Sequence, residues 1–253
     1  MAKPNALILR APGTNCDEES AWAFQLAGAT TQAVHINQLL DRPSLLKQFQ
    51  IICFPGGFSF GDDISAGQIL ASSIRARLQE QLLQFRDAGN LLLGICNGFQ
   101  VLVKTGLLDN EDDKGFGATL TWNTNGRYTA KWVSLKSSGE HCVFLRGIDQ
   151  MYLPIAHGEG RFVARDPATL DQFATRNQLP LRYVEGLTGG GNPNGSEADV
   201  AGMCDSTGRV FGLMPHPERN VHVTHHPRWT RLDRKRKPDG LAIFENAVSW
   251  FAA

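Results

Sequence analysis

The segment Gly94 to Gly98, a cysteine flanked by two glycines, constrains this chain more than any other. Leu91 to Leu93 are apolar and predict a buried strand before Cys96, and residues 99–103 continue in a helix-compatible pattern. A sharp strand-to-helix turn aims its central side chain outward, and the glycines remove the Cβ atoms that would crowd the bend. The free N–H groups at the helix start favour the thiolate. The segment therefore predicts a cysteine nucleophile at a strand end.

Strand and helix patterns alternate through the first hundred residues. Predicted strands cover Ala6 to Arg10, Ala33 to Ile36 and Ile51 to Phe54, and predicted helices cover Glu18 to Ala27, with Asp17 as its cap, and Gln68 to Asp87. This order predicts an α/β fold, with a mostly parallel central sheet flanked by helices. Ligands are then expected at the carboxyl ends of the strands, where both Cys96 and the Pro55 to Gly57 turn fall.

The spacing of apolar residues along the chain changes after Gly106. Tyr128 to Leu135 and several short runs up to Met214 alternate between two faces, which predicts additional antiparallel strands, and apolar residues between Leu241 and Phe251 recur at helical spacing. Without a break in composition, residues 1–253 are predicted to form one domain, with an irregular insertion near 109–125 and a C-terminal extension at 220–253.

Composition excludes several classes of function. The 25 Lys+Arg balance the 25 Asp+Glu, so no overall field attracts the chain to nucleic acid or to an anionic membrane. The N-terminus lacks the apolar length of a signal sequence or a membrane span, which predicts a cytoplasmic protein. Five cysteines without Cys-x-x-Cys spacing predict reduced thiols, with neither a disulfide framework nor a zinc ribbon.

A partner for the cysteine lies far downstream, in Met214 to Glu218. A cysteine hydrolase needs a base that takes and returns a proton, and the base needs an acceptor that fixes its tautomer. His216 and Glu218 fit these two roles, and Pro217 between them restricts the backbone so that the pair is rigidly presented.

Together these motifs resemble the class I glutamine amidotransferases, whose catalytic triad is Cys, His and Glu. Within that family, Gly94 to Gln100 is similar to the glutaminase subunits of phosphoribosylformylglycinamidine synthases. Three further segments agree in family order, Pro12 to Asp17, Pro55 to Asp62 and His157 to Phe162. The resemblance implies a flavodoxin-like fold and hydrolysis of glutamine through a cysteine thioester to glutamate and ammonia.

The resemblance also implies a role for each matching residue. Cys96 is the expected nucleophile, His216 the base and Glu218 its orienting acid. Backbone N–H groups of Gly57 and Asn97 form the expected oxyanion hole, and the expected substrate-binding residues are Gln100, Gly158 and Phe162. No metal ligand is expected.

The family passes its ammonia to a synthetase in purine biosynthesis. The expected partners are therefore a large synthetase subunit, a small accessory subunit and L-glutamine, with no nucleic acid and no membrane. The chain has no Gly-x-x-x-x-Gly-Lys-Ser/Thr loop, so no cofactor is expected here, and ATP and Mg²⁺ are expected on the partner. The 109–125 insertion and the basic, aromatic C-terminal segment are candidate contacts with it.

Simpler interpretations remain open for several residues. Cys96 alone fits an inert core thiol, and His216 alone fits a buried core histidine. Cys16 and Cys53 are interpreted as packing residues, although Cys16 borders a segment that the family places near the site. The cluster of His222, His225 and His226 lacks metal-ligand spacing and fits a solvated segment. A peptidase or deglycase on the same scaffold is the alternative enzyme, and a regulatory scaffold with a degenerate site is the non-enzymatic alternative.

Overall fold

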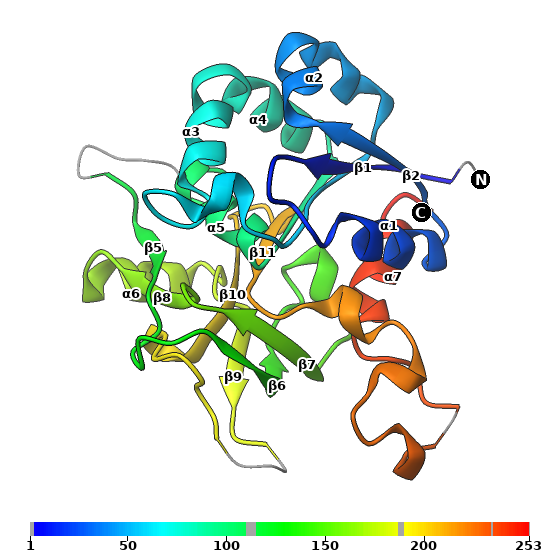
Figure 1. Cartoon of the computed structure of the whole chain (residues 1–253), viewed down its shortest axis with the longest axis vertical. Coiled ribbons are helices and arrows are strands. Elements are labelled where there is room, and N and C mark those ends of the chain that lie inside the picture. Colours follow the sequence, from blue (N-terminus) through cyan, green and yellow to red (C-terminus); the bar gives the residue numbers. More distant parts are fainter. Residues whose placement is uncertain (1–2, 110–114, 187–189, 234, 253) are drawn as a thin grey trace.

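A nine-stranded sheet forms the centre of the computed structural model, which describes residues 3–109, 115–186, 190–233 and 235–252. Five strands are parallel, in the order β2-β1-β3-β4-β11, and four antiparallel strands, β10, β9, β6 and β7, continue the same sheet (Figure 1). The parallel strands are β1 (Asn5–Arg10), β2 (Thr30–His35), β3 (Ile51–Phe54), β4 (Leu91–Ile95) and β11 (Val210–Leu213). The antiparallel strands are β6 (Thr129–Ser137), β7 (Gln150–His157), β9 (Leu181–Val184) and β10 (Val200–Cys204). The order of the parallel strands is that of flavodoxin-like folds, so the predicted fold class is confirmed.

Helices cover both faces of the parallel half. They are α1 (Asp17–Leu26), α2 (Ile36–Asp41), α3 (Gln68–Arg77), α4 (Gln79–Asp87), α5 (Asn97–Thr105) and α7 (Leu241–Ser249), whereas α6 (Pro167–Thr175) lies beside β8 (Arg161–Ala164). Figure 1 shows α1 and α7 together on one side of these strands and α3 with α5 on the other. Phe24 of α1 meets Phe244 of α7 edge to face, with ring centroids 4.9 Å apart. A second, two-stranded sheet pairs β5 (Ala118–Thr121) with β8 (Arg161–Ala164).

Three local predictions were wrong. The helix predicted over residues 68–87 is two helices, because the chain turns at Leu78 (φ −132°) and buries that side chain completely. Asp17 does not cap α1. Cys16 occupies the capping position, and the Asp17 carboxylate instead binds Arg10 at 2.7 Å. The second strand begins at Thr30 rather than Ala33, because it is an edge strand whose first residues are polar and largely exposed.

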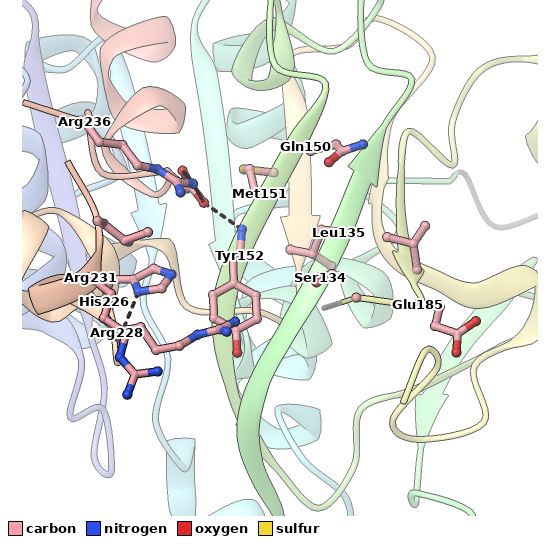
Figure 2. Close-up of a pocket in the computed structure, with 14 residues that line it drawn as sticks. Ser134, Leu135, Gln150, Met151, Tyr152, Glu185, His226, Arg228, Arg231 and Arg236 are labelled. Carbon is pink, nitrogen blue, oxygen red and sulfur yellow. Dashed lines mark hydrogen bonds and ion pairs between the residues drawn. The ribbon is translucent and has the colours of Figure 1, made fainter. Parts of the chain in front are cut away.

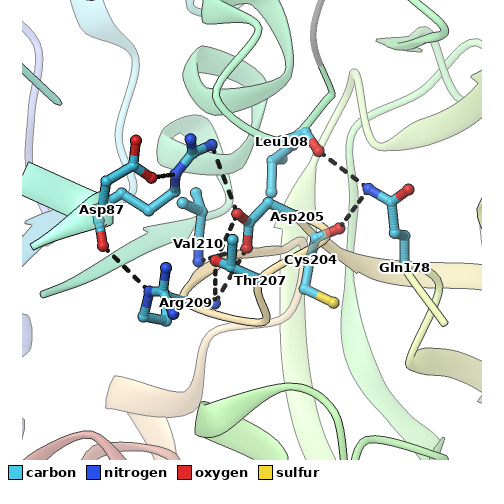
Figure 3. Close-up of polar contacts among 9 residues, drawn as sticks. Asp87, Leu108, Gln178, Cys204, Asp205, Thr207, Arg209 and Val210 are labelled. Atoms are coloured by element: carbon cyan, nitrogen blue, oxygen red, sulfur yellow. Dashed lines mark hydrogen bonds and ion pairs between the residues drawn. The ribbon is translucent and has the colours of Figure 1, made fainter. Parts of the chain in front are cut away.

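A buried carboxylate fixes the turn between β10 and β11 (Figure 3). The side chain of Asp205 accepts hydrogen bonds from the backbone N–H groups of Arg209 (3.1 Å) and Val210 (3.0 Å). The guanidinium of Arg209 donates to the carbonyl of Arg86 near the end of α4, at 3.1 Å. Gln178 joins the same turn to the segment after α5 by donating to the carbonyls of Leu108 and Cys204, each at 3.2 Å. These bonds hold β11 in place beside β4.

The strand register brings distant segments to one edge of the sheet. Leu213 at the end of β11 lies opposite Ile95 at the end of β4, and Phe54 at the end of β3 lies opposite Gly94. The residues that follow these three strands therefore emerge side by side. They are Pro55 to Gly57, Cys96 and Met214 to His216.

Candidate active site

Cys96 lies at a strained turn between β4 and α5. Its φ of 51° and ψ of −104° are outside the usual regions for a residue with a side chain, a cost on the order of 1–3 kcal/mol that the surroundings must impose. A Cβ at Gly94 would lie 2.6 Å from Leu102, and one at Gly98 would overlap the carbonyl oxygen of Phe54. Both glycines are thus required by the bend, as the sequence predicted.

His216 and Glu218 form a buried hydrogen-bonded pair. Nδ1 of His216 lies 2.5 Å from Oε1 of Glu218, and both side chains are almost fully buried. The backbone N–H of His216 donates to the carbonyl of Pro154 at 2.8 Å, and a 3₁₀ turn, Pro217–Asn220, begins directly after it. Pro217 therefore starts the turn that folds the carboxylate back onto the ring.

The thiol of Cys96 and the imidazole of His216 meet at this edge. Burial lowers the pKa of His216, whereas the Glu218 carboxylate and the Cys96 thiol raise it, and its net pKa lies well above the ordinary value. Within the described residues, Nε2 of His216 has no nitrogen or oxygen partner, and the thiols of Cys96 and Cys16 are the groups that interact with the ring besides Glu218. The structure thus brings Cys96, His216 and Glu218 together, and their role as a catalytic triad stays a prediction.

The backbone N–H groups of Gly57 and Asn97 have no backbone acceptor among the residues that the structure describes. Gly57 forms an antiparallel bridge with Thr14, and the hydrogen bonds of that bridge come from the residues on either side of Gly57, which leaves its own N–H turned away. At φ 148° a Cβ on Gly57 would lie 2.7 Å from the carbonyl oxygen of Gly13. Asn97 is the first residue of α5, where an N–H has no partner within the helix. The role of these two groups as donors to an oxyanion stays a prediction.

The side chain of Asn97 has a role that the sequence did not reveal. Its Oδ1 accepts from the N–H of Ser59 at 3.1 Å, and its Nδ2 donates to Asp62 (3.1 Å) and to Oε1 of Gln100 (2.9 Å). It therefore ties the loop after β3 to the cysteine turn. The available signal was a polar residue at the start of an otherwise apolar helix.

Gln100 and Asp62 lie in a partly buried polar cluster behind the cysteine. Nε2 of Gln100 donates to the carbonyl of Glu159 at 2.6 Å, which fixes the amide one helical turn after Cys96. Burial and the nearby Glu159 carboxylate raise the pKa of Asp62 to about 6. Contact of Gln100 with a substrate stays a prediction.

The segment after β7 supplies the other predicted substrate contacts. Gly158 is partly exposed beside Trp122, whereas Phe162 is buried in β8. His157 lies close by, with Nδ1 3.1 Å from Oδ1 of Asn123. Burial and the nearby His216 lower the pKa of His157 to about 4, so it is neutral at neutral pH. Roles for Gly158 and Phe162 stay predictions.

Cys16 contacts the candidate triad, which its interpretation as a packing residue missed. Nη2 of Arg219 donates to the Cys16 sulfur at 3.2 Å and is 3.0 Å from Glu19. Ligand atoms of Cys16, His216 and Glu218 lie within 4.8 Å of one another. The Arg219 cation at the sulfur opposes a metal ion there. The signal in the sequence was the family segment Pro12 to Asp17, which the bridge from Thr14 to Gly57 brings to the site.

Gly56 separates the loop backbone from the imidazole, and an added methyl group is expected to disturb catalysis. A Cβ at this position would lie 2.8 Å from Cε1 of His216 and 3.0 Å from the Cys16 sulfur. Gly56→Ala is expected to lower the kcat for glutamine about 100-fold by displacing the ring. Gly191→Ala is the matched control, because its Cβ would meet its nearest neighbour at 3.6 Å, an ordinary contact. Equal kcat values for the two variants would contradict this account of Gly56.

Comparison with known proteins finds similarity over nearly the whole chain. The model of the CobB/CobQ-like glutamine amidotransferase domain matches residues 3–251. The phosphoribosylformylglycinamidine synthase subunit PurQ of Dehalococcoides mccartyi is 47% identical, over 99% of this chain and 98% of the relative. The PurQ of Methanococcus maripaludis strain S2 is 42% identical, over 98% and 97%. A chain in the solved structure of PurLQS from Thermotoga maritima superimposes with a TM-score of 0.76 at 31% identity, and the match covers 99% of this chain and 100% of that chain.

Proposed function

Because the chain belongs to the family of CobB/CobQ-like glutamine amidotransferase domains, we propose that it is the glutaminase subunit of a phosphoribosylformylglycinamidine synthase. In this role it hydrolyses glutamine to glutamate and ammonia, and an ATP-dependent synthetase uses the ammonia to convert formylglycinamide ribonucleotide to formylglycinamidine ribonucleotide. The observation that carries the proposal is the strained turn at Cys96 facing the buried pair of His216 and Glu218.

Cys96, His216 and Glu218 act as the catalytic triad. The Cys96 sulfur attacks the side-chain amide carbon of glutamine, and the carbonyl oxygen takes the negative charge. His216, protonated by the thiol, gives that proton to the amide nitrogen, so the carbon–nitrogen bond breaks and ammonia leaves a glutamyl thioester. His216 then takes a proton from water, which attacks the thioester, and returns the proton to the sulfur as glutamate departs. Glu218 holds the ring and stabilises its charged form.

The N–H groups of Gly57 and Asn97 stabilise the oxyanion. Loss of one such donor typically raises the barrier by about 2.7–4 kcal/mol. Gln100, Gly158 and Phe162 form the site for the rest of the glutamine molecule. Support comes from the hydrogen-bonded anchoring of Gln100 through Asn97 and Glu159, which places its side chain on the same helix face as Cys96.

Exposed apolar side chains near the site support docking of a synthetase. The rings of Phe58 and Tyr128 are neighbours, with centroids 6.4 Å apart, and Trp122, beside Gly158, and Ile64 are exposed as well, Ile64 by 89%. Monomeric proteins rarely leave such side chains grouped in water. A synthetase subunit that covers them would receive ammonia before water protonates it. Trp122 belongs to the predicted 109–125 insertion, of which residues 110–114 lie outside the described chain.

ATP and Mg²⁺ belong to the partner in this proposal, and a small accessory subunit completes the complex. Residues 1–253 form one amidotransferase domain that works in the cytoplasm. Among the helices of the described residues, none has both the length and the apolar character needed to span a bilayer.

Reconstitution with the synthetase tests the function. The chain is mixed with the large subunit and the accessory subunit, and ammonia and glutamate are measured with and without formylglycinamide ribonucleotide, ATP and Mg²⁺. Glutamine hydrolysis is expected, with about tenfold or greater stimulation by the complete mixture. If the chain releases ammonia but the complete mixture does not stimulate the release, the ammonia is used by a synthetase with a different acceptor substrate. Cleavage of peptides or glycated amines without any ammonia from glutamine would assign the chain to the other cysteine hydrolases.

A further inference from the structure

A cleft of about 710 Å³ lies away from the cysteine turn, between the antiparallel strands and the segment that follows the triad. Its floor comes from β6, β7 and β9, and its other wall comes from His226, Arg228, Arg231, Leu232, Arg236 and Asp239. Figure 2 shows Arg228, Arg231 and Arg236 grouped on one side, Tyr152 in the middle and Glu185 on the far side. We call this cavity the arginine cleft. Its volume is that of a small-molecule site.

Two of the three arginines pair with no acidic side chain in the described part of the chain. Arg236 donates to both oxygens of Asp239, at 2.7 and 3.0 Å. No carboxylate in the described part of the chain forms an ion pair with Arg228 or Arg231, although both line the cleft. Two guanidinium groups in a concave site provide the planar, forked donors that bind phosphate oxygens.

The middle of the cleft is aromatic and firmly held. Tyr152 stacks on Trp132 with centroids 5.3 Å apart, and His226 packs against both rings. The backbone of Tyr152 is fixed on both sides, because its N–H donates to Asp239 at 2.8 Å and its carbonyl accepts from Asn220 at 3.0 Å. A wall that is ordered before binding lowers the entropic cost of binding.

We propose that the arginine cleft binds a small phosphorylated molecule, a phosphomonoester of the nucleotide class. Arg228 and Arg231 bind the phosphate, and the Tyr152 face supports a planar ring. On the far side, the Glu185 carboxylate accepts from hydroxyl or amino groups of the ligand. This separation of positive and negative walls favours a ligand with an anionic end and a hydrogen-bond-donating end, which a nucleoside monophosphate has.

Calorimetric titration of the full chain with AMP, and separately with adenosine, tests the proposal. AMP is expected to bind saturably at one site, and adenosine about tenfold or more weakly, because it lacks the phosphate. The double variant Arg228→Gln with Arg231→Gln is expected to lower AMP affinity about tenfold or more. Lys3→Gln with Lys235→Gln is the matched control, because it removes the same charge from exposed positions outside the cleft.

Four outcomes would overturn the proposal. They are the absence of saturable AMP binding, equal affinity for adenosine, unchanged affinity in the arginine double variant, and an equal loss in the lysine control, which would show an effect of net charge alone. Circular dichroism of each variant establishes that it is folded. If AMP does not bind and the arginine variant instead fails to assemble with the synthetase, the cleft is a protein contact. None of these measurements depends on glutaminase activity, so they separate this proposal from the proposed function.

Discussion

Cys96→Ala is expected to lower the rate of glutamine hydrolysis about 10⁴-fold or more, because it removes the sulfur proposed to form the thioester. The fold is expected to persist, since alanine tolerates the same backbone as cysteine at this turn and leaves the packing of Gly94 and Gly98 intact. Glutamine should still bind, through contacts that the thiol does not make. Stopped assays of ammonia release, with calorimetric titration of glutamine, measure the two effects separately.

Cys204→Ala is the control for this prediction. Cys204 is also buried, at the end of β10, where its sulfur contacts the carbonyl of Asn177 at 3.5 Å and the thiol of Cys142. Its replacement is expected to leave the rate unchanged. Substantial ammonia release by Cys96→Ala would show that another residue is the nucleophile. This result would contradict the assignment of Cys96, His216 and Glu218 as the catalytic triad.

Local features of the sequence were sufficient to predict the cysteine turn. Glycines beside Cys96 and the apolar run before it are signals carried by neighbouring residues, and the structure shows the crowding by Leu102 and Phe54 that requires those glycines. Residue chemistry suggested His216 as a partner for Cys96, but that the two meet in space was implied only by the family resemblance. The physical cause of their meeting is the register of β11 on β4, a long-range pairing that no short segment encodes.

Features that depend on tertiary contact escaped prediction for the same reason. Nothing in the residues around Leu78 breaks a helix, and the break arises because that side chain is drawn into the core. Cys16 was interpreted as a packing residue because its neighbours in sequence do not indicate a contact with Arg219, which lies 203 positions further along the chain. Likewise the antiparallel strands were expected, but their continuation of the parallel sheet beside β11 follows from pairing between distant strands.

Glu218→Gln is expected to lower kcat/KM for glutamine by about 10³- to 10⁴-fold, although the amide has the size of the carboxylate. The carboxylate raises the pKa of His216 against the opposing effect of burial, so its loss is expected to lower that pKa. The protonated imidazole that pairs with the thiolate then loses its proton at a lower pH. The alkaline limb of the pH–rate profile should therefore move toward lower pH in the variant.

Glu19→Gln removes a carboxylate from the neighbouring ion pair with Arg219 and serves as the control. It does not touch the imidazole, so its pH–rate profile is expected to match that of the unaltered chain. Loss of structure alone would lower the activity of Glu218→Gln at every pH by the same factor. A movement of the alkaline limb instead identifies Glu218 as the group that holds the proton on His216, and an unmoved limb would contradict that role.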